Sequence, residues 1–178
     1  YEAPANGYFE YSLHTDLLSP QDVLTRLFFI ICSISSAIDF NGKSVLDIGT
    51  GTGILAMFAR RRGAKLAVGT EIDPQALPCI AENFERNHFQ DSSAVLGFLD
   101  AFADDAKFDV IVCNMIRSEL WPLRDDIENL LADNGYFVVS GQLEEEKQYV
   151  LDWFNECGFT LDAELIRGEW WSARARRS

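Results

Sequence analysis

The sequence has 178 residues, of which 48% are hydrophobic and 24% are charged, a composition typical of one globular domain. Its formal net charge of −13 argues against nucleic acid as a partner, because phosphates would be repelled, and favours a basic partner if the charge does more than keep the protein in solution. No apolar run approaches the roughly 18 residues of a membrane span. The four cysteines lack any Cys-x-x-Cys spacing, so we expect a cytoplasmic protein with reduced thiols, no membrane association and no metal site.

The N-terminal part of the chain is expected to be irregular and then helical. Residues 1–19 are rich in aromatic side chains and show no regular period. Ser19 as a cap, followed by Pro20 at the first helical position, predicts a helix that runs to about Ala37.

A glycine-rich stretch organises the next part of the sequence. Val45, Leu46 and Ile48 form a short apolar run that predicts a buried strand, and Gly49, Gly51 and Gly53 predict the turn after it. A helix is expected over residues 54–62. This strand, glycine loop and helix are typical of a domain that binds a nucleotide-like ligand.

A second strand, expected over residues 66–72, follows at the separation of a parallel crossover unit and places Glu71 at its carboxyl end. The third glycine comes one residue too early for a dinucleotide fingerprint, and no Gly-Lys-Ser/Thr follows, which excludes a phosphate-binding NTPase loop. Asp47 would repel a phosphate but attract an ammonium group. The pattern therefore indicates S-adenosylmethionine, with its α-amino group at Asp47, its carboxylate at the glycine-loop amides and its ribose at Glu71.

The remaining elements continue the alternation of helices and strands. Asp73 and Pro74 are expected to begin a helix that runs to about Asn87, and Asn114 is expected to end a central strand. The other predicted elements are strands over residues 94–97, 108–113 and 136–140, helices over residues 118–132 and 142–157, and a closing antiparallel hairpin over residues 159–166 and 169–175.

Five motifs in this order resemble the class I methyltransferases, and within them the bacterial ribosomal-protein lysine methyltransferases of the PrmA type. The resemblance covers roughly residues 40–178 and includes the tail from Gly158 to Trp170. The motifs are Val45-Leu-Asp-Ile-Gly-Thr-Gly-Thr-Gly-Ile-Leu-Ala56, Glu71-Ile-Asp-Pro-Gln-Ala-Leu77, Asn83-x-x-x-Asn87, Phe108-Asp-Val-Ile-Val-Cys-Asn114 and Gly135-Tyr-Phe-Val-Val-Ser-Gly141.

This resemblance implies a Rossmann-like, doubly wound α/β fold with a seven-stranded mixed sheet whose last strand is antiparallel. We expect a single methyltransferase domain over residues 1–178. Residues 1–40 would supply an N-terminal lid and helix, and residues 41–178 the cofactor-binding and catalytic core. The oligomeric state is left open.

The resemblance also implies the cofactor site. In the lid, only His14 and the adjacent Thr15 match the family's Gly-Thr-Gly-x-His-x-Thr-Thr run, and a structural role for His14 is the competing interpretation. Asp100 is expected near the adenine, although it could instead cap a short helix over residues 101–105. The predicted cofactor-binding residues are His14, Asp47, Gly49, Thr50, Gly51, Gly53, Glu71, Ile72, Leu99, Asp100 and Asn114.

The acceptor is expected to meet the methyl group at residues 114–119. The Asn/Asp-Pro-Pro-Tyr motif of nucleic-acid and glutamine methyltransferases is absent, and arginine methyltransferases need two glutamates where only Glu119 is present. We expect Asn114 to hold a neutral amine through its side-chain oxygen and so to act as the catalytic residue, unless it is only a turn residue. Met115, Ile116 and Arg117 depart from the family's Asn-Ile-Leu-Ala run, and whether His14 or Glu119 acts as a base is left open.

The expected function is methylation of a protein lysine or terminal amine, with a basic protein or a small amine as substrate. A small-molecule O- or N-methyltransferase would share the cofactor residues, and a non-catalytic module would have kept the fold without binding the cofactor. Family members that methylate ribosomal protein L11 carry a separate N-terminal recognition domain, for which the 42 residues before Lys43 leave no room. We therefore expect either a trimmed chain or, preferably, a stand-alone relative that methylates L11 inefficiently.

Overall fold

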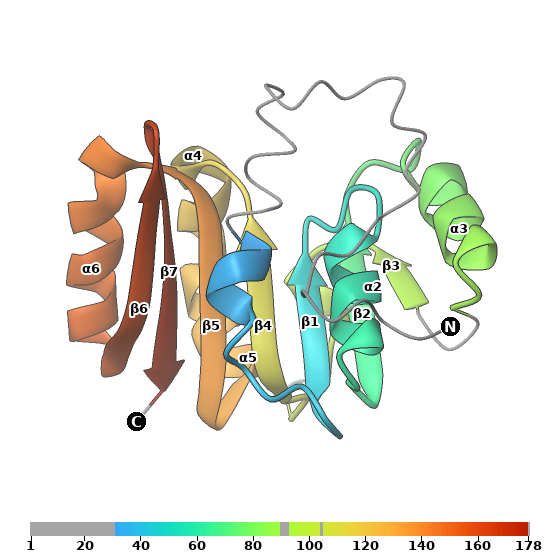
Figure 1. The fold of residues 1–178 in the computed structure, drawn as a ribbon, viewed down its shortest axis with the longest axis horizontal. Helices are drawn as coiled ribbons and strands as arrows, with labels where there is room; N and C mark the ends of the chain where they lie inside the picture. The colour runs from blue at the N-terminus through green and yellow to red at the C-terminus, as the bar shows by residue number, and fades with distance from the viewer. Residues whose placement is uncertain (1–30, 90–92, 104, 178) are drawn as a thin grey trace, which may run out of the picture.

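The fold was analysed in a computed structural model that describes residues 31–89, 93–103 and 105–177. These residues form one seven-stranded sheet with strand order β3-β2-β1-β4-β5-β7-β6 (Figure 1). The strands are β1 (Ser44–Ile48), β2 (Leu66–Glu71), β3 (Ser93–Leu96), β4 (Phe108–Asn114), β5 (Leu131–Leu143), β6 (Phe159–Arg167) and β7 (Trp170–Arg177).

The direction of the strands confirms the predicted fold. Strands β1 to β5 are parallel, whereas β7 pairs antiparallel with both β5 and β6. The strand order reverses between β1 and β4, which is where open α/β sheets bind their ligands.

Helices cover both faces of the sheet, so the domain has three layers (Figure 1). One core cluster packs residues 31–40, α2 (Ile54–Arg61) and α3 (Leu77–Arg86) against one face. The other packs α4 (Arg117–Leu120), α5 (Arg124–Leu130) and α6 (Lys147–Glu156) against the opposite face. Because parallel strands are covered on both sides, every residue of β1 and most residues of β4 are buried.

Three predicted helix boundaries were wrong. The helix expected from Asp73 begins only at Leu77, because the Asp73 carboxylate accepts from Gln75 N at 2.8 Å and forms a separate turn. The helix expected over residues 118–132 is divided into α4, a 3₁₀ turn (Trp121–Leu123) and α5, with a proline in the 3₁₀ turn. The helix expected from residue 142 begins at Lys147, after a 3₁₀ turn (Glu144–Glu146).

Strand β5 is much longer than the predicted strand over residues 136–140. The predicted turn is present but lies inside the strand, where Asn134 has a φ of 61° and the register with β4 shifts. At its other end β5 continues past Ser140, because Gln142 and Leu143 pair with Trp171 and Trp170 of β7. This extension brings Gln142 into the sheet.

The four cysteines differ in their burial. All four are free thiols, but Cys79 is exposed, whereas Cys113 is fully buried and burial raises the pKa of its thiol. Among the described residues, no group of histidine, cysteine and acidic side chains could hold a metal ion. Within the same ranges, no helix is long and apolar enough to cross a membrane.

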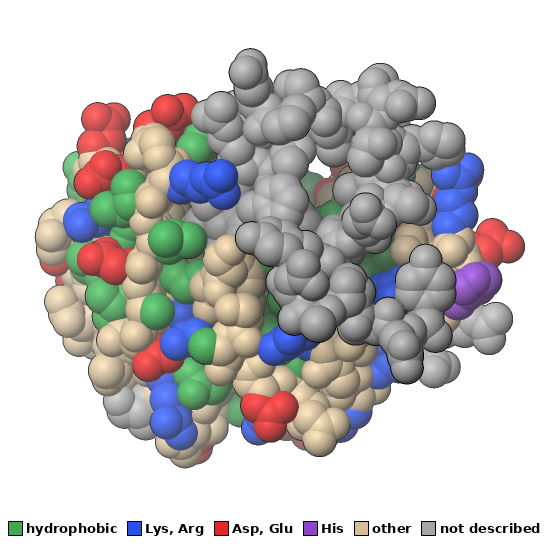
Figure 2. All heavy atoms as spheres, in the orientation of Figure 1, with side chains coloured by type: hydrophobic (Ala, Val, Ile, Leu, Met, Phe, Trp, Pro, Cys, Tyr) green, Lys and Arg blue, Asp and Glu red, His purple; other side chains and the backbone are tan. Residues whose placement is uncertain are grey.

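Hydrophobic side chains also reach the surface on the side of the molecule that carries β6 and β7, interspersed with charged ones (Figure 2). Strand β6 is an edge strand, and its residues Leu161, Leu165 and Ile166 are 36–40% exposed. Trp171 is fully buried, whereas Trp170 is only partly buried.

Candidate functional site

The predicted site lies at the carboxyl ends of β1, β2 and β4. The glycine loop between β1 and α2 bends through left-handed conformations at Gly49, Gly51 and Gly53, with φ angles of 65°, 56° and 80°. These angles strain any residue with a side chain, so the loop needs glycine for its path. His14, which was predicted to contribute from the lid, lies outside the described residues.

Asp47 lies in β1 beneath the glycine loop and is 1% exposed. Its Oδ2 accepts from the Thr50 hydroxyl at 2.6 Å and from Ala56 N at 3.0 Å, so the carboxylate holds the loop to the start of α2. Its Oδ1 is buried and accepts no hydrogen bond from any described residue. Burial raises the pKa of Asp47 to about 7, and the charge of Glu71 adds to this, although the bonds from Thr50 and Ala56 lower it.

The side chain of Thr50 is buried inside the glycine loop. It is 5% exposed, and its backbone N–H donates to Thr70 O at 2.8 Å, which ties the loop to β2. A Cβ on Gly69 would lie 2.6 Å from Thr50 Oγ1, so the absence of a side chain at Gly69 makes room for Thr50. Since its hydroxyl donates to Asp47 and its carbonyl oxygen accepts from Gly53 N at 2.9 Å, Thr50 is held by bonds within the protein.

Glu71, at the end of β2, faces the glycine loop as predicted. Its Oε2 accepts from Gly51 N at 3.0 Å, and its Oε1 accepts from Ile72 N at 2.9 Å and from Asp73 N at 3.1 Å. A carboxylate offers about four acceptor positions, so Oε2 keeps capacity for a hydroxyl donor. The carboxylate thus links the loops that follow β1 and β2 and remains partly exposed.

Gly51 and Gly53 differ in what surrounds them. A Cβ on Gly51 would find only Gly49 O within 4 Å, at 3.9 Å, so the space above this glycine is open. A Cβ on Gly53 would instead lie 2.6 Å from the ring of Phe84 on α3. Gly53 is therefore required for packing of α3 against the loop, and Gly51 is the glycine that leaves room for a ligand.

The predicted adenine side contains two exposed apolar side chains. Ile72 is 63% exposed and Phe98 is 61% exposed, although Phe98 was not among the predicted binding residues. Leu99 is 4% exposed and packs into the core, so its side chain is not available to a ligand. Asp100 is exposed and lies within a 3₁₀ turn (Leu99–Ala101), so the alternative prediction that it caps a helix over residues 101–105 was wrong.

Asn114 ends β4 on the other side of the glycine loop. Its Oδ1 is buried, and none of the residues that the structure describes donates a hydrogen bond to it. A Cβ on Gly141 of β5 would lie 3.1 Å from this oxygen and 2.9 Å from Met115 O, so Gly141 allows the close approach. The Met115 side chain turns toward the loop, because a Cβ on Gly49 would lie 2.5 Å from its Cε.

Gln142 lies beside Met115 and was not among the residues predicted for the site. Its side chain is fully buried, and its Nε2 donates to Met115 O at 2.5 Å. Its Oε1 is buried without a donor from the described part of the chain. In the sequence, Gln142 follows the apolar run of β5 after Ser140 and Gly141, and it was assigned to the following helix.

Of the departures from the family run at residues 115–117, Met115 packs against the core, Ile116 is exposed and Arg117 links two helices. Arg117 Nε donates to Glu146 Oε1 at 2.8 Å, and its guanidinium lies 4.8 Å from the centre of the Tyr149 ring. This arginine therefore joins α4 to α6. Glu119 is exposed on α4, and no geometry marks it as a base.

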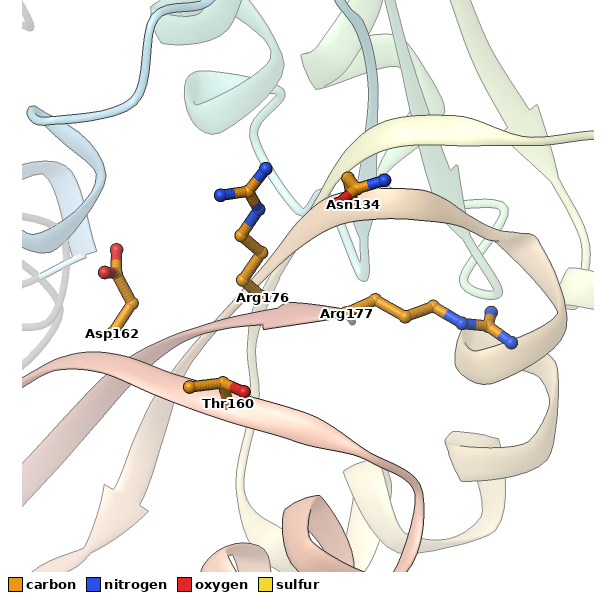
Figure 3. A pocket seen from close by; sticks show the side chains of 5 residues that line it. All are labelled: Asn134, Thr160, Asp162, Arg176 and Arg177. Carbon is orange, nitrogen blue, oxygen red and sulfur yellow. The ribbon is translucent and has the colours of Figure 1, made fainter.

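A separate pocket lies at the opposite edge of the sheet, where β5 begins and β7 ends (Figure 3). Arg177 points toward α5 and donates to the backbone carbonyls of Glu128 and Leu131. Arg176 lies 5.7 Å from the centre of the Tyr136 ring. These interactions are structural, and the pocket contains none of the predicted site residues. Its lining residues are Asn134, Thr160, Asp162, Arg176 and Arg177.

Comparison with known families identifies the relatives of this chain. The family profile described as "Ribosomal protein L11 methyltransferase (PrmA)" matches residues 32–178. The chain belongs to this family. The match includes every strand and helix described above, so the resemblance inferred from the five motifs is confirmed.

Curated relatives of the PrmA family agree with this assignment. The ribosomal protein L11 methyltransferase of Chromohalobacter salexigens is 38% identical over 133 residues, which are 75% of this chain and 44% of that protein. The protein of the same name from Haemophilus influenzae is 39% identical over 133 residues, with the same coverage. The chain thus spans less than half the length of these relatives.

Solved structures show the same fold. The ribosomal protein L11 methylase of Lactobacillus delbrueckii subsp. bulgaricus has a TM-score of 0.79 and 27% identity, covering 86% of this chain and 79% of that chain. A putative S-adenosylmethionine-dependent methyltransferase from Listeria monocytogenes has a TM-score of 0.72 at 12% identity, covering 87% of this chain and 99% of that chain. The second likeness concerns the fold alone.

Proposed function

We propose that this PrmA-family chain binds S-adenosylmethionine and transfers its methyl group to an amine nitrogen of a protein, a lysine side chain or a terminal amine. The observation that carries the proposal is the pair of buried acceptor oxygens, Asp47 Oδ1 and Asn114 Oδ1, near the carboxyl ends of the neighbouring strands β1 and β4. Neither has a donor among the described residues, and both suit a ligand that brings N–H groups.

The residues at the edge of the sheet fit the cofactor. Asp47 would accept from its ammonium group, the glycine loop would lie beside its carboxylate, and Glu71 would accept from the ribose hydroxyls. The open space at Gly51 would take the methionine part, and the exposed side chains of Ile72 and Phe98 would cover the adenine. When bound, S-adenosylmethionine supplies a methyl group on a positively charged sulfur that leaves as a neutral thioether.

The chain would contribute position more than acid-base chemistry. Asn114 Oδ1 would accept an N–H of the neutral amine and direct the nitrogen lone pair at the methyl carbon. The nitrogen forms the new N–C bond while the S–C bond breaks and the sulfur keeps the bonding pair, and the resulting ammonium then loses a proton to water. Orientation of this kind can lower the barrier by about 7–11 kcal/mol.

Ribosomal protein L11 is the first acceptor to test, because the curated relatives are named as L11 methyltransferases. The sequence-based expectation of a different acceptor stays a prediction. Incubation of the chain and labelled S-adenosylmethionine with unmethylated L11, and separately with cell extract, followed by mass spectrometry, would distinguish the two. Rapid methylation of L11 lysines supports the family substrate, whereas label only on another protein supports a stand-alone enzyme.

If the folded chain binds no S-adenosylmethionine by calorimetry, the proposal is wrong and a non-catalytic module is favoured. If it binds the cofactor but labels only small molecules, the protein acceptor is wrong.

A further inference from the structure

Gln142 occupies a position in which a polar side chain needs an explanation. Its side chain is fully buried at the carboxyl end of β5, and only one half of its amide is used. Nε2 donates to Met115 O, while Oε1 is buried and receives no donor from residues 31–89, 93–103 or 105–177. Buried polar atoms without a partner are rare in folded proteins, because each loses its bonds to water.

The amide of Gln142 belongs to the same small region as Asn114. A Cβ on Gly141 would lie within 3.1 Å of both Met115 O and Asn114 Oδ1, and Gln142 Nε2 bonds that same Met115 carbonyl. The end of β4 therefore gathers two side-chain oxygens, Asn114 Oδ1 and Gln142 Oε1, that accept nothing from the described residues. The Met115 side chain extends from the end of β4 to Gly49 of the glycine loop.

We propose that Gln142 is a second acceptor-positioning residue, which holds the substrate amine together with Asn114. A neutral primary amine has two N–H donors and one lone pair. Two carbonyl-type oxygens can take both donors and leave the lone pair directed at the methyl group, whereas Asn114 alone would leave the amine free to rotate. This inference rests on the proposed function, since it specifies how that site binds an amine.

The experiment compares the affinities of two cofactor analogues by calorimetry. S-adenosylhomocysteine lacks the methyl group, and sinefungin carries an amine-bearing carbon in place of the sulfonium, so its amine probes the place where acceptor and methyl meet. The variants are Gln142→Met, which removes both halves of the amide, and Gln142→Glu, which keeps the shape and an acceptor oxygen. Thermal unfolding of each variant checks that it is folded.

In the Gln142→Met variant, we expect sinefungin to bind at least about tenfold more weakly, as for the loss of one hydrogen bond to a charged group. The affinity of this variant for S-adenosylhomocysteine should change less than about twofold. In Gln142→Glu, the ratio of sinefungin affinity to S-adenosylhomocysteine affinity should stay as in the wild type. Equal weakening of both analogues in Gln142→Met would overturn the inference and leave Gln142 as a structural link between β5 and the turn after β4. If Gln142→Met keeps the wild-type ratio of sinefungin affinity to S-adenosylhomocysteine affinity, the inference is overturned as well.

These outcomes separate the inference from the function on which it rests. If the wild-type chain binds neither analogue, the proposed function fails and the inference fails with it. If the wild type binds both, only the behaviour of the variants decides about Gln142.

A second readout uses the number of N–H donors on the acceptor. Lysine, monomethyl-lysine and dimethyl-lysine offer two, one and no N–H donors in their neutral forms. Once an acceptor protein is in hand, Gln142→Met should slow the first methyl transfer most and the third not at all. A variant that slows all three steps by the same factor would contradict the proposed role.

Discussion

Asp109, at the amino end of the parallel strands, and Asp47, near their carboxyl end, differ in how completely their carboxylates are hydrogen-bonded. At the amino edge, Asp109 near the start of β4 is fully engaged: its Oδ2 accepts from Ser44 N at 2.8 Å and from Ser44 Oγ at 2.9 Å, and Lys43 Nζ lies 3.7 Å from its Oδ1. Partial burial alone would raise the pKa of Asp109, but the two Ser44 donors and the nearby lysines outweigh it and lower the pKa. This edge is complete without a ligand.

At the carboxyl edge, Asp47 is more deeply buried but less well satisfied. One of its oxygens has no donor in the described structure, and Asn114 and Gln142 each present a further buried oxygen in the same condition. Burying such atoms costs about 1–3 kcal/mol each. The difference indicates that the amino ends of these strands are bonded for stability, whereas their carboxyl ends keep free acceptors that a ligand with N–H groups would satisfy.

The largest expected effect is on the pH dependence of stability. The pKa of Asp47 is raised in the folded chain from 3.8 to about 7, so between these values the folded state binds more protons than the unfolded state. Stability relative to an Asp47→Asn variant should therefore fall by about 1.4 kcal/mol per pH unit as pH rises from about 4 to 7, and stay constant above. Urea unfolding of both proteins across this range measures the difference.

Asp109→Asn provides the matched control with the opposite sign. Because the pKa of Asp109 is lowered, its contribution is present above pH 3.8 and is lost as pH falls through its folded pKa. If the free energies of unfolding of the wild type and Asp47→Asn differ by a constant amount between pH 4 and 7, the pKa of Asp47 is not raised in the folded chain. The contrast between Asp47 and Asp109 would then be wrong.

The second prediction concerns Asn114. Asn114→Ala should lower kcat by about 100-fold, the size expected when the acceptor is misplaced, while the cofactor Kd changes less than about twofold. Since Asn114 Oδ1 has no donor in the described structure, its removal should not lower the free energy of unfolding by more than about 1 kcal/mol. Steady-state kinetics with calorimetry test this, with the exposed Asn155→Ala on α6 as control. Equal losses in binding and turnover would make Asn114 a cofactor residue instead.

The third prediction concerns Glu71. Glu71→Ala should weaken S-adenosylmethionine binding by about 1.5–3 kcal/mol, because it removes charged hydrogen bonds to the ribose and also releases Gly51 N and Ile72 N. Glu82→Ala is a suitable control, since that glutamate is exposed and pairs with Arg86 on α3. Unchanged affinity in a folded Glu71→Ala variant would remove this residue from the site.

The sequence predicted the parts of the site that depend on local spacing. The path of the glycine loop follows from residues within one turn, and the position of Glu71 follows from one parallel crossover, so both were expected from the motif alone. The seven-stranded order and the antiparallel last strand came from the resemblance and are confirmed.

The parts that were missed depend on contacts between distant segments. Gln142 was assigned to a helix because its burial requires β5 to extend, and that extension depends on pairing with Trp171. The inward side chain of Thr50 depends on Gly69 in the neighbouring strand, and the need for Gly53 depends on Phe84 of α3. No pattern within a short window reports which neighbour a side chain will meet.

The smallest expected effect comes from two glycine-to-valine substitutions, which distinguish a clash with the ligand from backbone strain. Gly51 and Gly168 have nearly the same φ, 56° and 65°, and a Cβ on Gly168 meets nothing within 4 Å. Valine at either position should therefore cost a similar free energy of unfolding, about 1–2 kcal/mol for the left-handed conformation. Only Gly51→Val places a side chain in the space proposed for the methionine part, so only this variant should bind S-adenosylmethionine more weakly, by about tenfold or more, as for an overfilled pocket. Calorimetry beside urea unfolding gives both quantities, and similar cofactor affinity in the two valine variants would mean that the open space above Gly51 is not the binding site.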